Sequence, residues 1–308
     1  MTQVFNPYLP SWEYVPDGEP RVFGNRLYIY GSHDAFNGPD FCVNDYVCWS
    51  APIDDLSQWR NEGVIYRKNQ DPRNVDGKMH MCAPDCVRGT DGRYYLYYQL
   101  HMLKCTSVAV SDKPEGPFEF YGYVQHSDGT PWGDKKGDTF AFDPGVLVGD
   151  DGRVYCYIGF APKGFMRTIF KLRGNKVEGS VCLELAPDMK TVISDEKPIV
   201  PGDRKAAGTS FDGHAFFEAS SIRKVGERYY YAYSSILSHE LCYAVSDHPD
   251  RDFVYGGTLV SIADIGYQGN TVPKNYTGNT HGGMAKLNDQ WYIFYHRQTN
   301  QQKCARQA

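Results

Sequence analysis

Residues 143–159 read DPGVLVGDDGRVYCYIG, a first strand followed by an Asp-Gly turn and a second strand rich in tyrosine. Asp-Gly is favoured in tight hairpins because both residues tolerate positive φ. Four other segments repeat this pattern of strand, turn and aromatic strand, and the five starts lie 60 to 75 residues apart. A period of this length indicates one supersecondary unit repeated around an axis. The five segments are residues 17–32, 83–99, 143–159, 218–235 and 281–297.

Further strands follow the hairpin in at least two of these units. Residues 108–112 lead to 116–118 in the second unit, and residues 243–247 lead to 252–254 in the fourth. Five four-stranded units without an amphipathic helix between them predict an all-β, five-bladed β-propeller rather than a sandwich. The fifth unit is short, which leaves two interpretations open: a closing strand from the N-terminal segment, or a truncated chain. We expect residues 1–308 to form a single propeller domain.

Composition and charge exclude several classes of protein. Hydrophobic residues make up 41% of the chain and charged residues 22%, as in a globular protein with a large core. The net charge is −5 and no block of Lys and Arg occurs, so nucleic acid is not an expected partner. No apolar run approaches the roughly 18 residues of a membrane span. The sequence does not indicate the oligomeric state.

The cysteines predict the cellular compartment. There are nine of them, an odd number, and most alternate with apolar residues in strand-like runs. This pattern is typical of reduced, buried thiols, so we expect a cytoplasmic protein. A secreted form that has lost its signal peptide stays open.

The residues that open the first strands are the candidates for chemistry. Blades of a propeller place their first strands around the central axis, so these residues should meet at its mouth. A repeat built only for packing would carry apolar residues there, since like charges held together cost stability. Three carboxylates suit glycoside hydrolysis, in which a carboxyl group with a raised pKa protonates the leaving oxygen and an ionised one activates water. Eleven or twelve positions before the aligned aromatic residue of each second strand, the chain has Asp17, Ala83, Asp143, Glu218 and His281.

Several motifs, taken in this order, resemble those of the family 43 glycoside hydrolases, and the resemblance spans the whole chain. That family consists of five-bladed propellers and contains inverting β-xylosidases and α-L-arabinofuranosidases. The motifs are Tyr14-Val15-Pro16-Asp17, residues 27–34 (LYIYGSHD), Ala83-Pro84-Asp85, Phe142-Asp143-Pro144, Glu218 ahead of Arg228-Tyr229-Tyr230, and His281-Gly282-Gly283.

The resemblance implies a role for each carboxylate. Asp17 would be the general base, Glu218 the general acid, and Asp143 the group that orients and tunes the acid. The sequence departs from the family at the base, which is usually followed directly by proline, whereas residues 16–20 read PDGEP. Glu19 is therefore a rival base. Glu19 does not lie eleven or twelve residues before the aligned aromatic residue of its second strand, so the spacing favours Asp17 as the base.

The resemblance also implies binding residues around the carboxylates. His281 would lie near the axis, where the family's histidine often contacts, directly or through water, a bound calcium or similar cation. His101, His239 and His296 fit no repeat position, and we interpret them as structural or exposed. An arginine from the C-terminal part of the chain would hold the sugar hydroxyls, and two arginines qualify. The sugar-binding residues implied in this way are His33, Ala83, Phe142, Arg297 and Arg306.

Together these observations predict an exo-acting, inverting hydrolase that removes terminal β-D-xylosyl or α-L-arabinofuranosyl residues from plant-type oligosaccharides. No organic cofactor is expected, because the chain lacks a phosphate-binding glycine loop and a dinucleotide fingerprint. The alternatives are a hydrolase for another glycoside such as a β-D-galactoside, a retaining propeller for fructosides, and a sugar-binding propeller without activity. A propeller that serves only as an interaction platform is disfavoured, because no Trp-Asp pair occurs in the chain.

Overall fold

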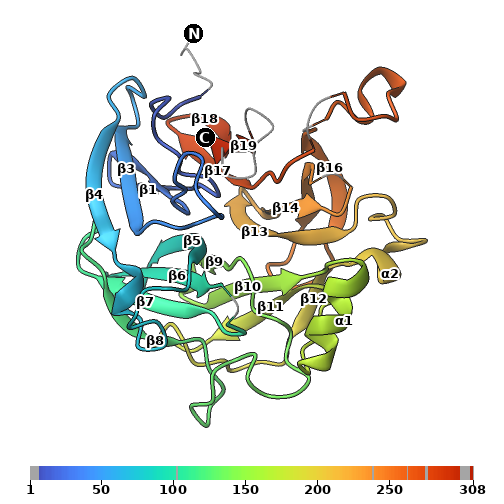
Figure 1. Cartoon of the computed structure of the whole chain (residues 1–308), viewed down its shortest axis with the longest axis horizontal. Coiled ribbons are helices and arrows are strands. Elements are labelled where there is room, and N and C mark those ends of the chain that lie inside the picture. Colours follow the sequence, from blue (N-terminus) through green and yellow to red (C-terminus); the bar gives the residue numbers. More distant parts are fainter. Residues whose placement is uncertain are drawn as a thin grey trace.

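The computed structural model describes residues 7–101, 103–237, 239–261, 263–274, 277–298 and 306–307. In this part of the chain, antiparallel sheets are arranged around a central axis (Figure 1). Each of the four complete sheets contains four strands in chain order, and each strand pairs with the next along the sequence. The all-β class and the propeller arrangement are therefore confirmed.

The complete blades follow the predicted repeats. The first contains β1 (Glu19–Phe23), β2 (Arg26–Tyr30), β3 (Tyr46–Pro52) and β4 (Arg60–Tyr66). The second contains β5 (Met81–Arg88), β6 (Tyr94–Leu100), β7 (Ser107–Ser111) and β8 (Glu119–Tyr123). The third contains β9 (Gly145–Val148), β10 (Val154–Phe160), β11 (Gly179–Leu185) and β12 (Lys197–Pro201). The fourth contains β13 (Phe216–Val225), β14 (Arg228–Ser235), β15 (Leu241–Ser246) and β16 (Val254–Val260).

The fifth repeat differs from the prediction. Its described part is a two-stranded sheet of β17 (Gly282–Leu287) and β18 (Gln290–Tyr295), so the described residues form four complete blades rather than five. Two short strands, β19 (Arg297–Gln298) and β20 (Arg306–Gln307), pair with each other instead of extending that sheet. The innermost strands still close a ring, because β1 contacts β5, β5 contacts β9, β9 contacts β13, β13 contacts β17, and β17 contacts β1.

Aromatic side chains fill the space between neighbouring blades. One buried cluster joins the first two blades around Tyr30 and Tyr98, and another joins the third and fourth around Tyr157 and Tyr231. These tyrosines lie in the second strands whose aromatic pattern defined the repeat. Their full burial explains that pattern, since large flat side chains cover facing sheets efficiently.

The five predicted hairpin turns contain residues with left-handed backbone. Their φ angles are 61° at Gly24, 87° at Gly92, 80° at Gly152, 61° at Gly226 and 53° at Asn288. This conformation is the reason that Gly and Asn recur at these positions.

The sequence predicted no amphipathic helix between the units, and the structure has one inside the third unit. Helix α1 (Gly164–Leu172) lies between β10 and β11, and the single turn α2 (Asp203–Ala206) follows β12. Both fall in the longest interval between repeats, that between Asp143 and Glu218. Short 3₁₀ turns occur at η1 (Lys68–Gln70) and η2 (Tyr267–Gly269). Among the described residues, no helix is long and apolar enough to cross a membrane.

Candidate active site

A cavity of about 470 Å³ opens where the first strands begin, and three of the predicted residues line it together: Asp17, Asp143 and Glu218. All three residues are buried. Asp17 and Asp143 stand two residues before β1 and β9, and Glu218 lies in β13. The other described residues that line the cavity are Asp40, Phe41, Cys42, His80, Cys82, His101, Phe142, Phe160, Met166, Phe217, His239, Thr277, Gly278, Asn279, Gln298 and Arg306.

The backbone is left-handed at each carboxylate or beside it. The φ angle is 58° at Asp17, 46° at Asp143 and 71° at Ala219, the residue after Glu218. Residues other than glycine rarely adopt this conformation, and strained backbone of this kind clusters at functional sites. The pairing of β13 with β14 also shifts register on either side of Glu218. These irregularities turn the side chains out of the regular strand alternation and toward the axis.

Asp17 is held as an ionised carboxylate. Burial alone would raise its pKa, but the Arg306 guanidinium, 3.2 Å from Oδ1, outweighs burial and lowers the pKa to about 2. The Asp17 backbone N–H donates to His296 Nδ1 at 2.8 Å. His296 Nε2–H in turn donates to Asn279 Oδ1 at 2.7 Å, so its partners fix the neutral tautomer.

Arg306 is the cation of the site. Its Nε and Nη2 donate to the two oxygens of Asp34 at 2.7 and 2.8 Å, a bidentate pair that fixes the guanidinium plane. Its Nη1 donates to Asp17 and to Asn279 Oδ1. Phe41 packs against the guanidinium, with its ring centroid 4.3 Å from Cζ.

Glu218 and Asp143 have the opposite character to Asp17. Burial and the negative charge of Asp17 raise the pKa of Glu218 to about 8. Burial, together with the charges of Glu218 and Asp17, also raises the pKa of Asp143 well above its usual range. Asp143 Oδ2 accepts the Ala219 N–H at 3.2 Å, and Glu218 Oε1 accepts from Asn279 Nδ2 at 3.3 Å. The cavity therefore combines an ionised carboxylate with a protonated carboxyl group.

The rival base, Glu19, is buried and does not line the cavity. Its Oε1 pairs with Arg223 at 2.5 Å and accepts from the Ser221 hydroxyl at 2.9 Å. Arg21 beside it forms a bidentate pair with Asp85. These residues form a layer of alternating charges along the inner strands, beyond the three carboxylates. We call it the axial ion layer (Glu19, Arg21, Asp85 and Arg223).

His281 lies next to the carboxylates, with Nδ1 3.9 Å from Asp17 Oδ1 and 4.0 Å from Asp143 Oδ2. Its imidazole is buried, and burial lowers its pKa. Glu19 Oε2 is buried without a hydrogen-bond partner among the described residues. Calcium takes oxygen ligands, so the unsatisfied carboxylate oxygen of Glu19 fits the expected ion directly, and the neutral imidazole of His281 could contact it only through a bound water.

Three predicted binding residues lie elsewhere. His33 does not line the cavity, because its ring nitrogens bond to Glu13 Oε1 and to the Asp45 carbonyl. Ala83 is buried behind the lining, where its N–H donates to Ser32 Oγ. Of the two arginines, Arg306 reaches the cavity and Arg297 does not line it.

The sequence did not reveal several residues that surround the carboxylates. His101 and His239 line the cavity, and His296 is fully buried beneath Asp17. Asn279 links Arg306 to Glu218 from a loop that belongs to no strand. These residues do not fall at the repeat positions from which the candidate residues were identified. Asp34 falls inside the 27–34 motif, which was the one available signal for it.

Comparisons with known proteins agree with this geometry. The sequence profile described as glycosyl hydrolases family 43 matches residues 14–307. A xylosidase/arabinosidase from Thermoclostridium stercorarium is 54% identical over 99% of this chain, and this chain spans 63% of the length of that relative.

Solved structures show the same fold. The GH43_1 enzyme from Xanthomonas citri complexed with xylotriose is 25% identical, with a TM-score of 0.73 over 98% of this chain and 87% of that one. An α-L-arabinofuranosidase from Clostridium thermocellum is 26% identical, with a TM-score of 0.64 over 92% of this chain and 82% of that one. Together with the profile match, these similarities place the chain in glycosyl hydrolases family 43.

Proposed function

We propose that this chain is an exo-acting glycoside hydrolase that removes terminal β-D-xylosyl or α-L-arabinofuranosyl residues from plant-type oligosaccharides with inversion. The observation that carries the proposal is the pairing, in one cavity, of an ionised Asp17 with a protonated Glu218. The relative at 54% identity bears the name xylosidase/arabinosidase, and a structural neighbour was solved with xylotriose, which supports a pentose-containing oligosaccharide as the substrate.

In the proposed reaction, Asp17 accepts a proton from a water molecule while the water oxygen bonds to the anomeric carbon. The bond from that carbon to the glycosidic oxygen breaks, and Glu218 gives its proton to this leaving oxygen. The amide of Asn279 donates to Glu218, and Asp143 orients and tunes the acid through the neighbouring Ala219, whose N–H it accepts. Arg306 keeps Asp17 ionised before the reaction.

Exo action follows from the closed end of the cavity. The buried ion pairs of the axial ion layer fill the axis beyond the carboxylates. A second cavity, lined by Pro20, Arg21 and Arg223 among others, shares no lining residue with the first. A chain end can enter such a pocket, whereas the middle of a polysaccharide would have to thread through it.

Three further features belong to the proposal. The hairpin of β17 and β18 is the inner half of a fifth blade, and residues 1–308 form one catalytic domain of a cytoplasmic protein. A calcium ion on the axis would be held by His281 and Glu19 with water, and when bound it would supply positive charge that favours the ionised Asp17. No organic cofactor takes part.

The test is hydrolysis of p-nitrophenyl β-D-xyloside, α-L-arabinofuranoside and β-D-galactoside by the wild type and by Asp17→Ala, Glu218→Ala and Glu19→Ala. We expect release from a pentoside, with kcat/KM lowered about 10³-fold by Asp17→Ala, as for loss of a general base. Glu19→Ala, the control for the rival base, should lose much less. Proton NMR of the first product should show the inverted anomer.

Other outcomes would support the alternatives. Preference for the galactoside would indicate that the substrate is a galactoside. Retention of configuration would indicate that one carboxylate acts as a nucleophile. A wild type that binds pentose but cleaves no glycoside would be a sugar-binding propeller. Full activity in Asp17→Ala together with inactivity in Glu19→Ala would move the base to Glu19.

A further inference from the structure

His239 stands beside the proposed acid without an evident partner. Its Nδ1 lies 3.9 Å from Glu218 Oε1, and its side chain, which is 28% exposed, lines the cavity. The ring packs on Phe217, with centroids 4.6 Å apart. Burial lowers the pKa of His239 to about 4, so the imidazole is neutral near pH 7.

The Nδ1 atom of His239 is buried and forms no hydrogen bond with any residue that the structure describes. By contrast, both ring nitrogens of His296 form hydrogen bonds. A buried polar atom without a partner costs free energy, so a ligand that supplies the missing hydrogen bond is bound more tightly. His239 Nδ1 can therefore form its missing hydrogen bond with a polar group of the substrate.

The position of His239 indicates which part of the substrate this group belongs to. Asp17 is surrounded by Arg306, His296 and His281, and no described contact joins it to His239. Glu218 protonates the leaving oxygen in the proposed reaction, so a residue that contacts Glu218 but not Asp17 lies beside the leaving group.

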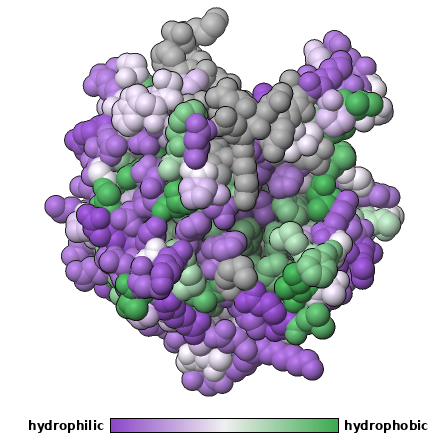
Figure 2. Space-filling view, in the orientation of Figure 1, coloured by the Kyte–Doolittle hydropathy of each residue, from purple (hydrophilic) through white to green (hydrophobic). Residues whose placement is uncertain are grey.

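The wall next to His239 is apolar. Phe217 contacts Phe160, and Phe160 contacts Phe170 of α1. Met166 of the same helix lines the cavity and is 50% exposed, and Phe165 beside it is 80% exposed. Figure 2 shows hydrophobic residues gathered on the surface over α1. Apolar side chains beside a single polar atom suit the face of a sugar ring with one hydroxyl directed at that atom.

We infer that His239, Phe217 and Met166 form the binding site for the sugar unit on the leaving-group side of the scissile bond. His239 Nδ1 forms a hydrogen bond with a hydroxyl of that sugar, and the two apolar side chains pack against its ring. This inference rests on the proposed function, because it uses Glu218 as the acid.

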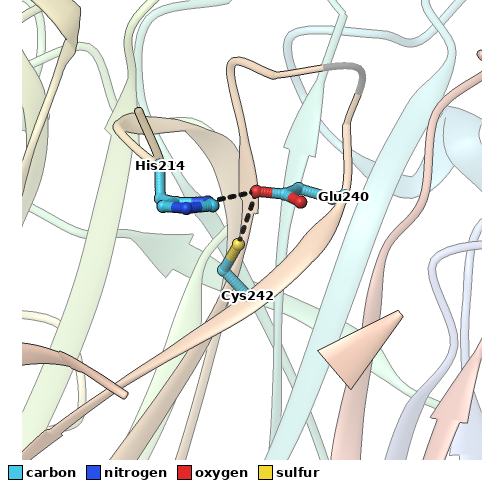
Figure 3. Close-up of side chains that lie close together, drawn as sticks. All are labelled: His214, Glu240 and Cys242. Atoms are coloured by element: carbon cyan, nitrogen blue, oxygen red, sulfur yellow. Dashed lines mark hydrogen bonds and ion pairs between the residues drawn. The ribbon is translucent and has the colours of Figure 1, made fainter. Parts of the chain in front are cut away.

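Three side chains that follow or lie near His239 in the fold interact with one another: His214, Glu240 and Cys242 (Figure 3). Glu240, the next residue, places Oε1 2.5 Å from His214 Nδ1 and 3.2 Å from Cys242 Sγ. Its carbonyl accepts the Ser235 N–H, which ties the turn to β14. His214, Glu240 and Cys242 are also the one group of potential metal ligands found among the described residues. Because these side chains form hydrogen bonds with one another, we assign them the role of anchoring this turn.

The test compares two substrates in wild type, His239→Ala and His239→Asn. Xylobiose has a leaving sugar with hydroxyls, whereas p-nitrophenyl β-D-xyloside has the same terminal sugar and a leaving group without hydroxyls. We expect His239→Ala to lower kcat/KM for xylobiose about 10- to 100-fold, as for loss of one hydrogen bond to a buried group, mainly through KM. Hydrolysis of p-nitrophenyl β-D-xyloside should change less than about threefold. His239→Asn, whose side-chain amide can replace Nδ1, should recover much of the loss.

Two results would overturn the inference: an equal loss on both substrates, which would place His239 at the terminal sugar or in the chemistry, and no loss on either. Thermal melts of each variant separate misfolding from lost binding, because a folded variant keeps the wild-type Tm. If the wild type prefers arabinofuranosides, the matching arabinose disaccharide and p-nitrophenyl glycoside replace the xylose pair. A wild type that cleaves no glycoside contradicts the proposed function instead, which keeps the two failures distinct.

Discussion

Asp17 and Glu218 are both buried carboxyl groups, yet their neighbours shift their pKa values in opposite directions. Asp17 lies against Arg306, and its pKa falls to about 2. Glu218 is buried beside negative charge, and its pKa rises to about 8. This separation supports the proposed roles of acid and base in a way that the sequence could not, because the repeat positions of the two residues are equivalent.

The raised pKa of Glu218 predicts how activity depends on pH. In the proposed reaction the acid must be protonated and the base ionised, so kcat/KM should be constant between about pH 2 and pH 8 and fall as Glu218 ionises above pH 8, about tenfold for each further unit of pH. The measurement is a pH profile of kcat/KM on an oligosaccharide substrate. If kcat/KM already fell with rising pH before pH 6 was reached, the result would contradict the pKa assigned to Glu218.

The same shift makes stability depend on pH. Because folding raises the pKa of Glu218 from 4.5, its protonated form contributes stability that is fully present below pH 4.5 and is lost as the pH rises through about 8. Glu218→Gln cannot ionise and should lack this loss, so its Tm should exceed that of the wild type most at alkaline pH.

Among the elements, the close contact between β9 and β13 has the most direct effect on the site, since β9 follows Asp143 and β13 contains Glu218. A Cβ at Gly145 would lie 2.5 Å from the Ser220 carbonyl oxygen, so no larger residue fits without a shift of the backbone.

We predict that Gly145→Ala separates these two strands. Both Tm and kcat/KM should fall, because the two carboxyl groups would move apart. The control is Gly129→Ala, where φ is +83° and no atom lies within 4 Å of the new Cβ, so that only about 1–2 kcal/mol of backbone strain is expected. Wild-type kinetics in Gly145→Ala would show that this contact does not position the carboxylates.

At this scale the sequence predicted strands well and connections poorly. Period-two aromatic strands and Gly or Asn turns are local signals, so the repeats and the residues that open them could be read directly. The helix α1, which brings Met166 to the cavity, lies in a connection where no repeat applies. Asn279, His239 and Arg306 likewise reach the site from loops or from the chain end, and their positions depend on tertiary packing. Arg297 and Arg306 were indistinguishable for this reason.

For the whole molecule, the axial ion layer and the site above it predict a response to metal removal. If calcium binds between His281 and Glu19, chelation with EDTA should lower Tm and kcat/KM, and added calcium should restore both. Glu19→Gln should weaken this calcium dependence, since it removes the unsatisfied carboxylate oxygen. Metal analysis of the purified protein measures occupancy directly, and an unchanged Tm after chelation would argue against a bound ion.

The axial ion layer also determines the order in which products can depart. Arg21, Asp85, Glu19 and Arg223 fill the axis beyond the three carboxylates, so in the proposed reaction a cleaved pentose would lie between this layer and the sugar unit from which it was released. The shortened oligosaccharide must leave first, and the free pentose can follow only afterwards. Until it does, it occupies the place that the next chain end requires, so accumulated pentose should compete with substrate and slow the enzyme as hydrolysis proceeds.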